Sequence, residues 1–97
     1  MDEPDWWYLS FCDPLLPRGT QFLGACFCRG RDQRQAVQAA WNLGCNPGGE
    51  VISTGPISHL YIMNKVPPDY REVLLSKEVM VEQLGWSMEN VFRERAR

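Results

Sequence analysis

Four cysteines and a single histidine are the residues of this 97-residue chain whose types suit metal binding or nucleophilic chemistry. The chain has no Cys-x-x-Cys pair, only Cys26-Phe27-Cys28. On a strand, residues two apart point to the same face, so Cys26 and Cys28 could share one ion. A zinc site would then be completed by Cys45, Cys12 or His59. The same sulfurs could instead lie side by side as reduced thiols in a core, and we favour this interpretation.

The cellular compartment of the protein decides whether its cysteines are thiols or disulfides. The stretch from Met1 to Asp5 is acidic and has neither the basic region nor the apolar region of a signal peptide. The longest apolar runs span about seven residues, whereas a membrane helix needs about 20. We therefore expect a cytoplasmic protein that is not embedded in a membrane and holds no cofactor, with its cysteines reduced. A disulfide framework stays an alternative.

The stretch Leu43-Gly44-Cys45-Asn46-Pro47-Gly48-Gly49-Glu50-Val51 is unusually rich in glycine. Turn chemistry explains part of it, because Gly44 suits a helix end and paired glycines permit positive φ. Backbone N–H groups without side chains also form nests that bind anions. We predict that a protein partner or a small anionic ligand binds near Gly44–Glu50. The predicted site residues are Asn46, Gly48, Gly49, Glu50, Arg29, Arg31 and Trp6.

Arginine and tryptophan supply the outer parts of that predicted site. Residues 18–34 carry four arginines and one aspartate, which makes a local cationic patch. Trp6 follows the acidic Asp5 and is the aromatic residue expected to be exposed. The net charge is −2, and four acids lie in the first 13 residues. We therefore do not expect a nucleic-acid binder.

Enzymatic motifs are absent from the chain. It has no Gly-x-Gly-x-x-Gly, no phosphate-binding loop and no local signature that pairs His59 with a cysteine. We expect a non-enzymatic protein, and a cysteine-nucleophile enzyme is the remaining alternative.

Local patterns predict the elements that position these residues. Strands are expected at Trp6–Cys12, Phe22–Arg29, Glu50–Thr54 and, as an optional fourth, His59–Met63. Asp32 and Gln35 have capping-box spacing and open a helix over Gln33–Leu43 with its apolar stripe at Ala36, Val37, Ala40, Trp41 and Leu43. Further helices are expected from Asp69 to Leu75, over Lys77–Leu84 and over Met88–Arg95.

This order predicts an α+β fold, a two-layer β-β-α-β-(β) sandwich with C-terminal helices. Residues 1–97 form one domain of this length, with flexible ends at 1–5 and 93–97. The first strand carries large side chains on both faces, so both faces of the sheet should be buried. The C-terminal segment could fold back over the second face, or a second copy could cover it in a homo-oligomer.

Parts of the chain resemble a group of small uncharacterised bacterial and phage proteins. The similar stretches are Trp7–Phe11, Phe22–Cys26, Leu43–Val51 with Gly55-Pro56, Val66–Pro68, Tyr70-Arg71 and Leu74–Ser76. The resemblance assigns no activity to any residue. Small phage-type proteins often act as inhibitors or sequestering proteins, and by analogy this one would be a binding protein.

Overall fold

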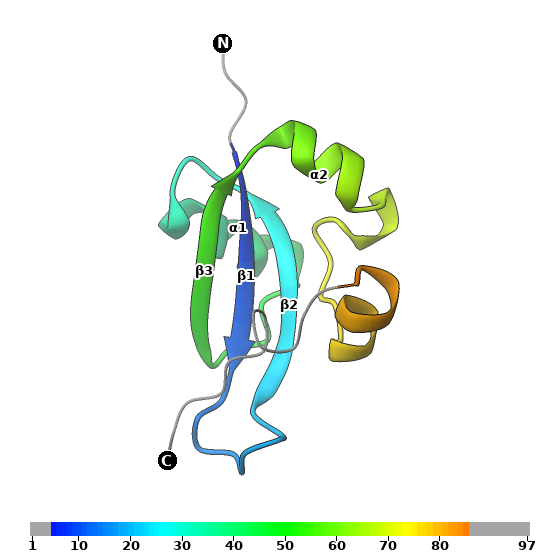
Figure 1. The fold of residues 1–97 in the computed structure, drawn as a ribbon. Coiled ribbons are helices and arrows are strands. Elements are labelled where there is room, and N and C mark those ends of the chain that lie inside the picture. The colour runs from blue at the N-terminus through cyan, green and yellow to red at the C-terminus, as the bar shows by residue number, and fades with distance from the viewer. Residues whose placement is uncertain (1–4, 86–97) are drawn as a thin grey trace.

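The computed structural model describes residues 5–85 of the chain and shows an α+β fold (Figure 1). A three-stranded antiparallel sheet is accompanied by helices, as the sequence predicts. In chain order the elements are β1 (Trp6–Cys12), β2 (Phe22–Arg29), α1 (Gln33–Leu43), β3 (Glu50–Ile57), α2 (His59–Lys65), η1 (Pro68–Tyr70) and η2 (Val79–Gln83).

The sheet has the strand order β2-β1-β3, with β1 in the centre and antiparallel to both neighbours. Six of the seven residues of β1 are buried, because large side chains point to both faces. The chain crosses from β2 to β3 through α1, which is the predicted β-α-β connection. Trp6 pairs with Arg29 on one side of β1, and Cys12 pairs with Glu50 on the other, at the opposite end of the sheet.

One face of the sheet is covered by α1, whose bounds match the prediction. The Asp32 carboxylate accepts a hydrogen bond from the Gln35 backbone N–H at 2.8 Å, and the Gln35 side chain accepts one from the Arg31 N–H at 2.9 Å. These two bonds satisfy N–H groups that an open helix end leaves without partners. Gly44 ends the helix in the left-handed conformation at φ 79°.

The second face is covered by the chain that follows β3. Trp6, Tyr8 and Phe27 of the sheet form a buried cluster with side chains from α2 and the segments after it. Those side chains are Ile62, Val66, Leu75 and Met80. The prediction that both faces are buried is therefore confirmed within residues 5–85, and of the two covers left open for the second face the structure shows the chain folded back over it.

The predicted fourth strand at His59–Met63 is wrong. These residues belong to helix α2, whose first turn is capped by Ser58: its hydroxyl accepts a hydrogen bond from the Tyr61 N–H at 3.1 Å. Ile62 and Val66 are buried four residues apart, which is helical spacing. The β-favouring side chains in this stretch are overridden by the cap and by this burial.

The predicted helix from Asp69 to Leu75 is also wrong. Only the short 3₁₀ turn η1 forms, and the chain then runs along the outer edge of β2. Ala25 and Leu75 exchange two backbone hydrogen bonds, of 3.0 and 2.7 Å, and the Glu72 N–H donates to the Phe27 carbonyl at 3.0 Å. Hydrogen bonding to the free backbone groups at the edge of β2 is thus favoured over a local helix in this segment.

The predicted helix at Lys77–Leu84 is present as a short helical segment that ends in the π-helix η2. The Ser76 hydroxyl accepts from the Val79 N–H at 3.3 Å, and Gly85 has the positive φ expected of a stop. The predicted helix at Met88–Arg95 and the flexible ends lie outside the described residues, save for Asp5. Among residues 5–85, no helix has the length and apolar character needed to cross a membrane.

Candidate functional site

Three cysteines meet in the core between the sheet and α1. Cys26 and Cys28 come from β2, and Cys45 follows the end of α1. The Sγ atoms of Cys26 and Cys28 lie 3.6 Å apart, those of Cys28 and Cys45 lie 3.7 Å apart, and all three fall within 4.8 Å of one another. We call Cys26, Cys28 and Cys45 the cysteine cluster.

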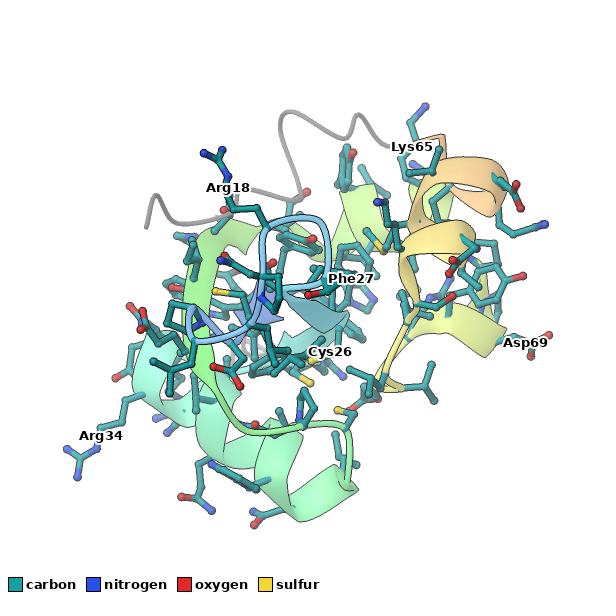
Figure 2. All side chains as sticks on the ribbon, turned by 90° about the horizontal axis from the view of Figure 1, so that it is seen from below. Arg18, Cys26, Phe27, Arg34, Lys65 and Asp69 are labelled. Carbon is teal, nitrogen blue, oxygen red and sulfur yellow. The ribbon has the colours of Figure 1, made fainter. Side chains whose placement is uncertain are left out.

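Local structure explains why these sulfurs converge. Strand alternation places Cys26 and Cys28 on the α1 face, while Phe27 between them points to the other face (Figure 2). Gly44 turns the chain back at the end of α1, and the Cys45 N–H donates to the Ala40 carbonyl at 3.0 Å. This turn carries the Cys45 side chain back toward the sheet.

The cysteine cluster is buried among apolar side chains. Cys26 and Cys28 are fully buried, and Cys45 is 3% exposed. The side chains packed in the same buried group are aliphatic or aromatic: Leu9, Phe11, Ala36 and Ala40. All four cysteines of the chain are free in the structure.

Hydrogen bonding among the sulfurs sets their different acidities. The Cys26 thiol lowers the pKa of Cys28, because it donates to the Cys28 sulfur in its charged form. The same contact raises the pKa of Cys26, and burial adds to that rise. Burial, followed by the charge of Cys28, raises the pKa of Cys45 to about 11. Cys28 is therefore the cluster member that most readily carries negative charge.

Two of the three distances between the sulfurs are close to that of a metal–thiolate site, and the third is within 4.8 Å. With Zn–S bonds of about 2.3 Å, a tetrahedral arrangement separates neighbouring sulfurs by roughly 3.8 Å. The two sulfur contacts at 3.6 and 3.7 Å need little movement to reach that spacing. The sequence predicts that Cys26 and Cys28 share one face of a strand, and they do. It could not choose their companion among Cys45, Cys12 and His59.

The other two predicted ligands lie elsewhere. The imidazole Nδ1 of His59 accepts a hydrogen bond of 3.1 Å from the indole Nε1 of Trp6, and Trp6 belongs to the buried cluster on the second face. Cys12 is buried at 3% exposure but does not join the three sulfurs. The structure thus reduces the predicted set to Cys26, Cys28 and Cys45.

The glycines of the Gly44–Glu50 loop have structural roles. The Asn46 side chain accepts a hydrogen bond from the Gly48 N–H at 2.8 Å, which occupies one of the groups that an anion nest would use. A Cβ atom on Gly49 would lie 2.5 Å from the Cys12 carbonyl oxygen, so only glycine fits there.

The remaining predicted site residues do not converge on this loop. Arg29 pairs with Trp6 at one end of β1, whereas Glu50 pairs with Cys12 at the other, about 20 Å away along the strand. Trp6, expected to be exposed, is 2% exposed and lies beneath the Arg29 guanidinium, whose Cζ is 5.3 Å from the ring centre. Arg31 is exposed beside the start of α1.

A groove between α1 and β3 was not predicted. It has a volume of about 540 Å³ and is lined by Val37 and Trp41 of α1 and Val51 of β3, together with polar residues of the first turns of α1. The predicted apolar stripe is wrong at its C-terminal end, because Trp41 is 55% and Leu43 is 49% exposed. Only Ala36 and Ala40, one turn apart, are buried.

The comparisons with known proteins add no relative: no protein-family model, curated protein or solved structure matches the chain. The resemblance of Leu43–Val51 and the other stretches to small bacterial and phage proteins stays a prediction.

Proposed function

We propose that this protein is a small non-enzymatic module that binds a thiophilic metal or metalloid ion on the sulfurs of Cys26, Cys28 and Cys45. Of the interpretations open from the sequence, the thiolate site is the one that the geometry supports best. Thiolates are the ligands that soft and borderline ions prefer.

The observation that carries this proposal is the contact of three sulfurs from two separate parts of the chain, at 3.6 and 3.7 Å. Cys26 and Cys28 are neighbours through strand alternation alone, but Cys45 is brought to them by the turn after α1. An ion held there would link β2 to the end of α1, and its binding free energy would stabilise the fold.

A cysteine-nucleophile enzyme is less well supported. A nucleophilic thiol needs a general base within hydrogen-bond reach and access for its substrate. The imidazole of His59 is hydrogen-bonded to Trp6, and the cluster sulfurs are almost fully covered.

The experiment is metal analysis of protein purified without chelator and kept reduced, followed by titration of the ion-free protein with Cd²⁺. Cadmium–thiolate charge-transfer absorption should grow to one equivalent. Replacement of any one cluster residue by serine should abolish it, whereas Cys12→Ser, which alters a buried thiol outside the cluster, should leave it unchanged. The proposal is wrong if the correctly folded wild-type protein shows no such absorption.

A second candidate function, recognition of a protein partner, is favoured by the exposed indole of Trp41 in the groove between α1 and β3. Tryptophan is enriched among the residues that dominate protein interfaces. The test compares native mass and partner capture for the wild type and Trp41→Ser. If the wild type is a dimer and Trp41→Ser is not, the partner is a second copy of the chain. If the variant keeps both the native mass and the captured partners of the wild type, this candidate function is wrong.

A further inference from the structure

The cysteine cluster offers three sulfurs, and within residues 5–85 no further cysteine, histidine, aspartate or glutamate side chain joins them. All four cysteines and the histidine lie within residues 5–85. Cys12 stands apart from the three sulfurs, and His59 is bonded to Trp6 of the second-face cluster. Structural zinc sites almost always have four protein ligands. The cluster therefore fits an ion that is satisfied by three.

Water is a poor substitute for the missing ligand here. A buried water needs two to four polar partners. The side chains packed around the sulfurs are those of Leu9, Phe11, Ala36 and Ala40, which have no polar atoms. Cys26 and Cys28 have no exposed surface. An occupant that needs a bound water to complete its coordination would be destabilised in these surroundings.

Charge gives a separate criterion. A divalent ion with three thiolates leaves a net charge of −1, and an uncompensated charge in an apolar core is costly. The charge of Glu72 acts on Cys28 and works to raise its pKa, so the charge beside the cluster is negative. Glu72, whose backbone is bonded to the neighbouring Phe27, is acidic and offers an anion no compensation. A trivalent ion with three thiolates has no net charge.

We propose that the cysteine cluster binds a trivalent, three-coordinate metalloid, As(III) or its chemical analogue Sb(III), taken up as the neutral hydroxide. This inference rests on the proposed function and narrows its ligand class. The lone pair of the pyramidal As(III) centre occupies the direction in which zinc would need a fourth ligand.

The binding step is a condensation without redox change. One arsenous acid molecule reacts with three thiols: three As–O bonds break, three As–S bonds form, and each hydroxide leaves as water with a thiol proton. Arsenic remains trivalent and the sulfurs remain at the thiol level, so no oxidant or reductant takes part. Of the three cluster cysteines, Cys45 alone has exposed surface, and it follows the end of α1. We therefore expect the ligand to enter from the side of Cys45.

The experiment adds sodium arsenite to the full chain, reduced with a phosphine that carries no thiol, and measures the product by native mass spectrometry. We expect one adduct whose mass gain equals one arsenic atom less three hydrogens. Each of Cys26→Ser, Cys28→Ser and Cys45→Ser should weaken arsenite binding by about 100-fold or more, a loss that even supporting residues of metal sites reach. Cys12→Ser is the matched control and should bind as the wild type does.

A measurement on the wild type alone covers the case in which a serine variant does not fold. Calorimetric titrations in two buffers of different ionisation enthalpy count the protons exchanged on binding. Arsenous acid should release none, because the thiol protons leave as water, whereas Zn²⁺ or Cd²⁺ should release protons to the buffer.

The outcomes separate this inference from the proposed function. If Cd²⁺ or Zn²⁺ loads the cluster and arsenite gives no three-hydrogen adduct, the trivalent ligand is wrong and the metal module stands. Serine variants that keep wild-type arsenite affinity also contradict the three-coordinate site. If neither class of ion binds, both proposals fall.

Discussion

The two faces of the sheet carry different kinds of buried side chain. On the α1 face, Ala36 and Ala40 of one regular helix pack with Leu9, Phe11 and the three sulfurs of the cysteine cluster. On the second face, the large rings of Trp6, Tyr8 and Phe27 are covered by α2 and by irregular segments. Cys26 and Phe27 are adjacent in sequence and lie on opposite faces (Figure 2). Strand β2 thus contributes a sulfur to one face and an aromatic ring to the other.

The two faces should therefore contribute differently to folding stability and to ligand binding. Trp6, Tyr8 and Phe27 bury more apolar area than the three thiols do, so the loss of a ring from the second face should cost more stability than the loss of a cluster sulfur. Small residues and sulfurs supply less stability, but they leave ligand atoms in contact where a larger side chain would have filled the space.

The largest expected effect comes from removing a ring on the second face. Phe27→Ala should lower the free energy of unfolding by about 3–5 kcal/mol, because the ring is fully buried and its loss leaves a cavity. Cys26→Ala, its neighbour on the α1 face, removes one sulfur atom and should cost much less, about 1 kcal/mol. Urea denaturation of the two variants measures the difference.

If both variants lost the same free energy of unfolding, the proposed difference between the two faces would be wrong. Total stabilities of small domains are about 5–15 kcal/mol, so Phe27→Ala could leave a folded fraction too small for a full unfolding curve. Phe27→Leu retains much of the apolar volume. It keeps the comparison measurable and should fall between the other two variants.

The next effect is the stabilisation by a bound ion, which should belong to the α1 face alone. At a free ligand concentration of 100 times the dissociation constant, binding adds about 2.7 kcal/mol to stability. Cadmium or arsenite should therefore raise the melting temperature of the wild type and of Phe27→Leu by similar amounts, since the substituted ring does not contact the cluster. Cys28→Ser should show no such rise, and a rise of equal size in that variant would place the ion elsewhere.

The faces also differ in how well the sequence predicts them. Helix α1 carries its own signals: the Asp32 cap, the Gln35 side chain that completes the box, and the terminal Gly44. Its bounds could therefore be predicted from neighbouring residues. The bounds of β1 and β2 were also predicted, because Trp6–Cys12 and Phe22–Arg29 are rich in large apolar side chains. The predicted end of the third strand at Thr54 is wrong, since β3 continues to Ile57.

Long-range contacts decided what the sequence could not predict. The segment after η1 runs along β2 because Ala25 and Leu75 complete each other's hydrogen bonds, a pairing of residues fifty positions apart. The membership of Cys45 in the cluster depends on how α1 packs on the sheet, which no local spacing encodes. The exposure of Trp41 depends on the same packing.

The smallest expected effect tests whether local signals count equally on both faces. Asp32→Ala and Ser58→Ala each remove the side chain that caps a helix, α1 on one face and α2 on the other. Each should lower the free energy of unfolding by about 1 kcal/mol, because a backbone N–H loses its partner. Asp32→Asn and Ser58→Thr keep an oxygen acceptor and should cost less, as denaturant midpoints will show.

A clear inequality between the two caps would be informative in either direction. If Ser58→Ala costs far less than Asp32→Ala, then α2 is held by the burial of Ile62 and Val66, and its cap is secondary. If the costs are equal, the cap of α2 was as strong a local signal as that of α1, and the strand prediction at His59–Met63 failed because β-favouring side chains concealed it. In that case both faces encode their helices locally, and the difference between them lies in the side chains that fill the core.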